Sequence, residues 1–256
     1  MRRVRVIPVL LIQNGGLVKS IKFRNHKYVG DPINAVKIFN DKEVDEIIIL
    51  DISATPNKRV PDINHISEIA GEAFMPFAYG GGITSVDQVT EILYQGAEKV
   101  VLNTSALENP SLIESVANRY GAQSVVVSID VKNTLIGGQR VFRNGGSKKT
   151  SWHIEAFAKH VESLGAGEIM LTSIDQDGTF DGFDTKMINK VSSAVKVPVI
   201  ACGGASSLVD LRAGIDAGAS AVAAGSFFIY QMPHRAVLIS YPSQSDLKTD
   251  IFDHLG

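Results

Sequence analysis

The chain has 256 residues, 45% of them hydrophobic and 20% charged, with a formal net charge of -2. This composition is typical of an ordinary soluble globular protein with one large core, and the balanced charge gives no reason to expect a nucleic-acid partner or an anionic membrane. Cys202 is the only cysteine, which excludes an internal disulfide and a cysteine-based metal cage.

Short β-branched runs alternate with helical stretches along the whole chain, a pattern typical of βα units and a parallel sheet. Eight βα units close into a barrel, and no Pro-, Gly- or Ser-rich linker divides this chain. We therefore predict an α/β protein, a (βα)₈ TIM barrel, with one domain over residues 1–256. The candidate strands are 4–11, 46–51, 75–79, 98–103, 124–130, 168–173, 197–202 and 220–225.

An internal repeat indicates that the barrel consists of two similar half-barrels. Four landmarks recur in the same order at nearly constant offset. The pairs are Leu11 with Asp130, Leu50-Asp51-Ile52-Ser53 with Ile174-Asp175-Gln176-Asp177, Gly81-Gly82-Ile83 with Gly203-Gly204-Ala205, and Asn103-Thr104 with Gly225-Ser226.

Two connections are longer than the usual βα loop. Residues 13–30 form a basic segment that includes Lys19, a predicted phosphate- or substrate-binding residue, and residues 132–150 resemble a short hairpin. Both follow strands, so both belong to the C-terminal face, where barrel enzymes carry their sites. Each is either a solvated excursion or a substrate lid.

The glycine pairs predict two symmetric phosphate sites. A glycine lets backbone N–H groups approach an anion, and the loops after strands 7 and 8 are the usual phosphate site of a barrel. A single Gly-Gly pair is usually only a tight turn, but two symmetric copies favour a doubly phosphorylated small-molecule ligand. The predicted binding residues are Gly81, Gly82, Asn103 and Thr104 in one half and Gly203, Gly204, Gly225 and Ser226 in the other.

Further candidates lie at other strand ends. Asp130 ends an apolar strand at the barrel mouth, where burial can adapt a carboxylate to acid–base work, or it could merely hold a loop. Thr172 faces inward by strand alternation and is a plausible hydrogen-bond donor to a ligand. Asp177-Gly178 is either a binding element or only a turn, and Asp51 and Asp175 are equally ambiguous.

Four charges are predicted at the opposite end of the barrel. Side chains an even number of residues apart share a face of a strand, so Arg5 shares its face with position 11, Lys99 with Asn103 and Glu168 with Thr172. Glu46 starts the second strand. Each charge alone would be a rim ion pair of little consequence, but four facing the axis would form a plug.

Other chemistries lack their motifs. The sequence has no Ser-His-Asp order, no nucleophile elbow, no His-rich metal spacing and no dinucleotide fingerprint, so we predict no metal and no cofactor. No apolar run approaches the roughly 20 residues that cross a bilayer, and no targeting segment precedes the first strand. The cytoplasm is the expected location.

Together these landmarks resemble the cyclase subunit of imidazole glycerol phosphate synthase over nearly the whole chain. The resemblance implies a barrel that receives ammonia from a glutaminase on its bottom face, passes it through a charged gate and uses it at the top with a doubly phosphorylated substrate. Arg5, Glu46, Lys99 and Glu168 match that gate. The segments that carry the resemblance include Gly30-Asp31-Pro32, Gly80-Gly81-Gly82-Ile83, Gly165-Ala166-Gly167-Glu168 and Leu171-Thr172-Ser173-Ile174-Asp175.

The catalytic pair departs from that family. The resemblance implies one aspartate at the end of strand 1 and one at the end of strand 5, and this chain has Leu11 and Asp130. The segment Asn14-Gly15-Gly16-Leu17-Val18-Lys19 after the first strand instead resembles a divergent branch. That branch is associated with acetamidino modification of sugars in surface polysaccharides, in which ammonia passes to a separate sugar amidotransferase.

We therefore expect an ammonia-conducting barrel subunit of a glutamine amidotransferase complex, with a glutaminase and a sugar amidotransferase as partners. One alternative is a working cyclase of histidine biosynthesis, and another is a scaffold that binds a phosphorylated ligand without chemistry. The neighbouring genes discriminate between the first two: a sugar amidotransferase gene beside this one would favour the conducting subunit, and histidine-pathway genes would favour the working cyclase.

Overall fold

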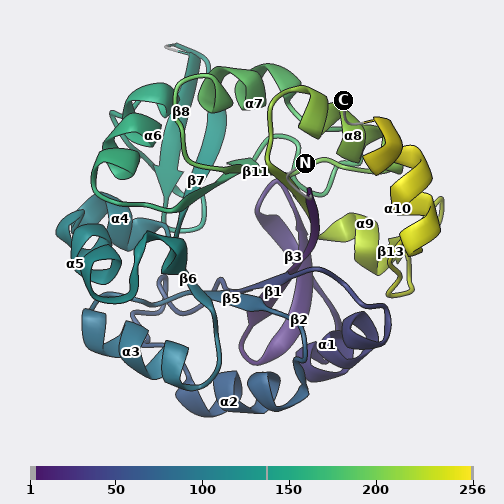
Figure 1. Cartoon of the computed structure of the whole chain (residues 1–256), viewed down its shortest axis with the longest axis horizontal. Helices are drawn as coiled ribbons and strands as arrows, with labels where there is room; N and C mark the ends of the chain where they lie inside the picture. Colours follow the sequence, from purple (N-terminus) through teal and green to yellow (C-terminus); the bar gives the residue numbers. More distant parts are fainter. Residues whose placement is uncertain (1–3, 137, 255–256) are drawn as a thin grey trace.

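Eight parallel strands close into a barrel in the computed structural model, which describes residues 4–136 and 138–254. The strand order is β10-β11-β12-β1-β4-β5-β6-β7, and pairing of β10 with β7 closes the cylinder (Figure 1). This confirms the (βα)₈ prediction. The barrel strands are β1 (Arg5–Gln13), β4 (Ile47–Asp51), β5 (Phe77–Gly80), β6 (Lys99–Leu102), β7 (Val125–Thr134), β10 (Glu168–Ser173), β11 (Val199–Cys202) and β12 (Ala221–Ala224).

The eight predicted strands all overlap these elements. Most boundaries differ by at most two residues, but β7 continues four residues beyond the predicted end. It does so because it pairs antiparallel with a further strand, β8 (Gly138–Arg143), which forms the expected hairpin in residues 132–150.

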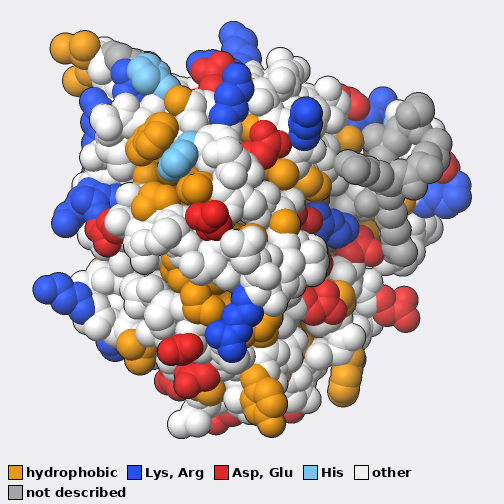
Figure 2. All heavy atoms as spheres, turned by 60° about the vertical axis from the view of Figure 1, so that its left-hand side comes forward, with side chains coloured by type: hydrophobic (Ala, Val, Ile, Leu, Met, Phe, Trp, Pro, Cys, Tyr) orange, Lys and Arg blue, Asp and Glu red, His pale blue; other side chains and the backbone are white. Residues whose placement is uncertain are grey.

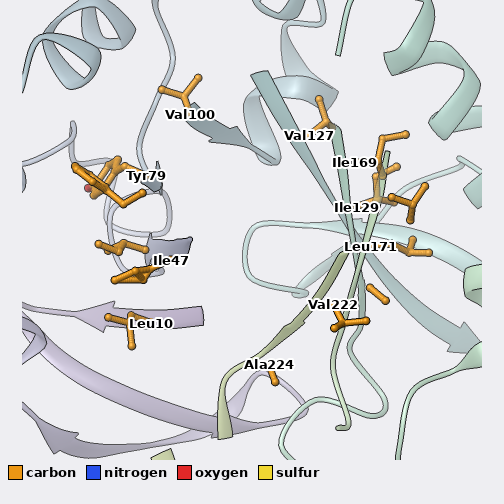
Figure 3. Close-up of a cluster of buried hydrophobic side chains, with 14 of the residues drawn as sticks. Leu10, Ile47, Tyr79, Val100, Val127, Ile129, Ile169, Leu171, Val222 and Ala224 are labelled. Carbon is orange, nitrogen blue, oxygen red and sulfur yellow. The ribbon is translucent and has the colours of Figure 1, made fainter. Parts of the chain in front are cut away.

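Strand alternation divides the apolar residues between two layers. Along β1, Val6 and Leu10 pack in the outer core beneath the helices, whereas Ile7 and Val9 pack inside the barrel. Figure 3 shows outer-core side chains from several strands, including Leu10, Ile47, Tyr79, Val127 and Leu171. Inward positions are therefore left to fill the cylinder or to line a site.

Helices form a ring around the strands (Figure 1), and several begin at sequence-encoded caps. The Asp31 side chain accepts a hydrogen bond from Asn34 N with Pro32 in the first turn, and Ser85 and Gln88 form a capping box.

Charged side chains of both signs are interspersed over the molecular surface that Figure 2 shows. The helices are α1 (Pro32–Asp41), α2 (Ile63–Glu72), α3 (Val86–Tyr94), α4 (Thr104–Glu108), α5 (Ser111–Tyr120), α6 (Ile154–Ser163), α7 (Thr185–Ser192), α8 (Leu208–Asp216), α9 (Ser226–Ile229) and α10 (Gln244–Asp250), with 3₁₀ turns η1 (Ala122–Ser124) and η2 (Phe252–His254).

The long segment 13–30 is also a hairpin, which the sequence did not predict. It consists of β2 (Gly16–Ile21) and β3 (Arg24–Gly30), and β2 pairs with the end of β1. Two short strands complete the set: β9 (Lys148–Lys149) extends the second hairpin, and β13 (Tyr230–Gln231) pairs with β14 (Ala236–Val237).

The segment after β14 returns to the barrel wall, where the hydroxyl of Tyr241 donates to the carbonyl of Val6 (2.8 Å). Within the described ranges, no helix combines the length and apolar character needed to cross a membrane.

Candidate functional site at the barrel mouth

A cavity of about 470 Å³ lies at the carboxyl ends of the barrel strands. Cavities at this end of a TIM barrel are where the chemistry of such enzymes takes place. Ten of the predicted site residues line it: Lys19, Gly81, Gly82, Asn103, Thr104, Asp130, Thr172, Asp177, Gly225 and Ser226. The structure thus brings together residues from both half-barrels and from the first hairpin.

Asp130 is buried and held at both carboxylate oxygens. Ser128 Oγ donates to Oδ1 (3.2 Å), and Asn103 Nδ2 donates to Oδ2 (3.2 Å). Burial raises the pKa of Asp130 to about 7; the Ser128 hydrogen bond opposes this shift and the nearby Asp177 charge adds to it. A carboxyl group that titrates near neutrality can give or take a proton at working pH.

Lys19 reaches into the cavity from β2 and is only 3% exposed. Its Nζ donates to the carbonyl of Val9 (2.6 Å), and a Cβ placed on Gly225 would lie 2.7 Å from that nitrogen. Burial lowers the pKa of Lys19 to about 8, although the Asp177 carboxylate partly restores it. The ammonium group therefore lies at the strand end that carries the predicted Gly225–Ser226 anion site.

Leu11 faces the cavity from the end of β1. Together with Val9, Leu50, Val101 and Met170 it makes much of the wall apolar. Cys202 is buried in the wall, and burial raises the pKa of its thiol to about 12, whereas the Thr172 hydroxyl group opposes this shift. A thiol with that pKa stays protonated, so it does not serve as a thiolate nucleophile.

Three predicted binding residues, Gly178, Gly203 and Gly204, do not line this cavity, and their part in ligand binding stays a prediction. Backbone packing explains why these positions are glycine. A Cβ on Gly204 would lie 2.0 Å from the carbonyl oxygen of Gly182, and one on Gly178 would lie 2.1 Å from that of Ser20. Both have positive φ, which favours glycine without any ligand.

Both hairpins fold over the cavity. In the first, Ser20 Oγ donates to Asp177 Oδ2 (3.0 Å) and Lys22 N donates to Asp177 O (2.8 Å). In the second, Asn144 N donates to Thr104 Oγ1 (3.0 Å), and Arg143 pairs with Glu108 on α4. The hairpins meet where a Cβ on Gly146 would lie 3.0 Å from the ring of Phe23. They have the position that a lid requires, and their movement stays a prediction.

The two ambiguous aspartates hold loops. Asp51 Oδ1 accepts from the backbone and hydroxyl of Ser53 (2.9 and 2.7 Å), and Asp175 Oδ2 accepts from the backbone and side chain of Asn133 (2.8 and 3.0 Å). Sequence reasoning also missed Ser20 and Ser128. Ser128 carried a signal, because it lies two residues before Asp130 and so shares its inward face.

The four charges at the amino end form a closed ring of ion pairs. Arg5 pairs with Glu46 and with Glu168 (Nη2 to Oε1, 2.7 Å), and Lys99 Nζ pairs with the same two carboxylates (2.9 and 3.2 Å). The side chain of Glu46 is 4% exposed and that of Glu168 12%. Burial opposes the Arg5 charge, but the two carboxylates outweigh it and raise the pKa of Arg5. The four side chains thus form the predicted plug, and its role as an ammonia gate stays a prediction.

No set of three or more His, Cys, Asp or Glu side chains in the described part of the chain is arranged to hold a metal ion. The charged and titratable groups of the cavity wall instead include the carboxyl groups of Asp51, Glu108, Asp130 and Asp177, the buried ammonium group of Lys19 and the imidazole of His26, beside several hydroxyl and amide groups. These groups suit proton transfer and the binding of an anionic ligand.

The fold and cavity define a TIM-barrel protein of the kind whose site lies at the carboxyl ends of its strands. Residues 5–233 match the family described as "Histidine biosynthesis protein", and the chain belongs to this family. The three relatives described next carry the HisF name, and the matches cover 90–96% of this chain.

Three relatives illustrate the range of sequence identity. The chain is 50% identical over 251 residues to "Putative imidazole glycerol phosphate synthase subunit hisF2" of Pseudomonas aeruginosa, covering 96% of this chain and 99% of that protein. It is 49% identical over 248 residues to "Putative imidazole glycerol phosphate synthase subunit HisF" of Leptospira interrogans, covering 96% and 98%. With "Imidazole glycerol phosphate synthase subunit HisF" of Exiguobacterium sibiricum it shares 40% over 232 residues, covering 90% and 93%.

Proposed function

We propose that this protein is the barrel subunit of a glutamine amidotransferase complex and conducts ammonia, released by a glutaminase at its amino-end face, toward the cavity at its mouth. The relatives' names describe a subunit of imidazole glycerol phosphate synthase, which supports a role within a larger enzyme. The family resemblance supplies the glutaminase as the partner.

The ion-pair ring is the observation that carries this proposal. Four charged side chains that converge on the barrel axis lose much of their hydration, and buried ion pairs of this kind are weak stabilisers compared with apolar packing. Stability alone is therefore a poor reason for the ring. A small neutral molecule such as ammonia could pass when one pair opens, whereas the charges would still block larger solutes.

Leu11 supports conduction rather than cyclisation in the cavity. Asp130 is positioned for proton transfer, but the wall at β1 offers only a leucine side chain where the family resemblance implies a second carboxylate. Leucine cannot move a proton, and loss of a general acid or base typically costs about 10²–10⁴-fold in rate. Ammonia that reaches the cavity would then pass to a partner enzyme, which completes the reaction.

For the final acceptor we propose a sugar that receives an acetamidino group, with a separate sugar amidotransferase as the second partner. The segment after β1 supports this assignment through its resemblance to the divergent branch. Four relatives at 47–50% identity have names that begin with "Putative", two of them ending in HisF and the others in hisF2 and hisF3. Three relatives named HisF without that word share 40–43%. The cytoplasm is the proposed location.

The test is binding to the cognate glutaminase from the same organism. We expect the two to co-purify and the glutaminase to hydrolyse glutamine faster in the mixture, because ammonia release and acceptance are coupled in such complexes. The control is Phe74→Glu. Phe74 is 83% exposed in the loop that leads from α2 to the amino end of β5, so a negative charge there should weaken the association. No association at micromolar concentration, and no change in hydrolysis, would remove the conduit and favour a ligand-binding scaffold.

A working cyclase of histidine biosynthesis is the second candidate. The family description and the unqualified HisF relatives at 40–43% identity favour it. Growth of a cyclase-deficient strain without histidine, on expression of this protein, would support it over the sugar pathway.

A further inference from the structure

The inward face of β7 carries a column of side chains from the ion-pair ring to the mouth. Parallel pairing with β10 sets Val126 opposite Glu168, Ser128 opposite Met170 and Asp130 opposite Thr172. Ser128 therefore lies one inward position above the ring and one below Asp130. At about 3.3 Å per residue, each of these steps is about 7 Å.

The surroundings of Ser128 are apolar. The interior cluster at this level includes Val9, Val101 and Met170, and the same residues line the lower wall of the cavity. Of the buried polar side chains among the described residues, Ser128 is the one on an inward strand face between the ring and Asp130. A hydroxyl group in such a setting needs a specific partner, because an unpaired one would be costly.

That partner is Asp130, and the arrangement fixes the carboxyl group at two points. Ser128 Oγ donates to Oδ1 (3.2 Å). Asn103 Nδ2 donates to Oδ2 (3.2 Å) and also to the carbonyl oxygen of Ser128 (2.9 Å). The backbone and the side chain of Ser128 thus both take part in setting how Asp130 faces the cavity.

We propose that Ser128 is a positioning residue that orients the Asp130 carboxyl group. Its hydroxyl oxygen is also the first one above the ring that can accept a hydrogen bond from a small N–H donor. A serine hydroxyl that donates its hydrogen to a carboxylate keeps oxygen lone pairs for accepting another hydrogen bond. Ammonia that leaves the ring would meet this oxygen before it meets Asp130. This last step rests on the proposed conduit function, whereas the orientation of Asp130 does not.

The orientation can be tested without a partner protein. The infrared C=O band of protonated Asp130, isolated by ¹³C-aspartate labelling and subtraction of Asp130→Asn spectra, is followed against pH. In Ser128→Ala we expect the titration midpoint to rise by about one pH unit, because a donor that favours the charged form is lost. Ser128→Thr keeps the hydroxyl and restores the midpoint.

Ser124→Ala is the matched control, because Ser124 is buried just before the same strand but bonds to the carbonyl of Tyr120 instead. It leaves the midpoint unchanged. An unchanged midpoint and an unchanged C=O frequency in folded Ser128→Ala would overturn the proposal. If the glutaminase does not bind, the conduit fails, but the infrared titration still decides the role of Ser128.

Where the complex forms, Ser128→Ala causes a loss of glutamine-derived nitrogen from the product, and Ser124→Ala causes none. Equal incorporation of glutamine nitrogen in the two variants would overturn the ammonia step and leave the orientation of Asp130 to the infrared result.

Discussion

Asp130 lies directly opposite Thr172 in the pairing of β7 with β10, and Glu168 begins the same β10 strand four residues earlier. At about 3.3 Å per residue, the ring carboxylate is therefore about 13 Å below the carboxyl group at the mouth. One strand pair carries a member of the ion-pair ring at one end and the buried carboxyl group of Asp130, in the cavity wall, at the other. Substitutions at its two ends can therefore separate transport from chemistry.

Removing one carboxylate from the ring should destabilise the fold. In Glu46→Gln, Arg5 and Lys99 lose their shared 4% exposed partner, and we expect the free energy of unfolding to fall by about 2–3 kcal/mol. Urea denaturation measures it. The control is Glu72→Gln, which breaks an exposed pair with Lys37 and should cost about 0–0.5 kcal/mol. Equal losses in the two variants would show that the ring behaves as a surface network.

The buried carboxyl group of Asp130 should make stability depend on pH. Its pKa is about 7 in the folded state against about 3.9 in an unfolded chain, so between these values the folded state binds more protons. Stability contributed by the neutral form is present at low pH and is lost as pH rises toward 7. Relative to Asp130→Asn, the wild type should lose on the order of 2–4 kcal/mol between pH 4 and 8. A parallel pH dependence in the two proteins would contradict the raised pKa.

The barrel and much of the cavity could be predicted from the sequence because both follow from local patterns. β-branched runs give the strands, and alternation places Thr172 on the same inward face as Glu168. The half-barrel repeat located both glycine pairs. It could not show that Gly204 and Gly178 serve backbone packing, since their neighbours, Gly182 and Ser20, depend on how the loops fold.

The burial of Lys19 also could not be predicted from the sequence. The sequence leaves residues 13–30 as either a solvated excursion or a substrate lid with Lys19 as a binding candidate, and only the hairpin pairing of β2 shows that this lysine is buried against Val9. Contacts between the hairpins, such as Phe23 against Gly146, join segments more than a hundred residues apart. No local periodicity encodes them.

The wild type should be a poor cyclase. With Leu11 at the end of β1, formation of an imidazole product from the histidine-pathway substrate and free ammonium should be at least about 10²-fold slower than in a relative with both carboxylates. Leu11→Asp should recover part of this rate, because the side chain already faces the cavity. Leu11→Asn is the matched control, since it is polar but cannot transfer a proton. Equal rates in these two variants, or rescue of a cyclase-deficient strain by the wild type, would contradict this explanation.

Changes at the ring and at Asp130 should affect different nitrogen sources. Lys99→Met removes two ion pairs at the amino end of the barrel, whereas Asp130→Asn removes the titratable group at the mouth. With the complete complex, ¹⁵N-amide glutamine and unlabelled ammonium, we expect Lys99→Met to lower the ¹⁵N share of the amidated product. Asp130→Asn should leave that share close to the wild-type value.

The comparison also decides whether the barrel is itself the catalyst. Free ammonium enters the acceptor without crossing the ring, so a transport defect spares product made from ammonium. A defect in proton transfer spares neither source, because both nitrogens need the same chemistry. If Asp130→Asn abolishes product from both sources while Lys99→Met changes nothing, Asp130 is a working acid–base catalyst. The ring is then a structural feature, and the cavity is an active site in its own right.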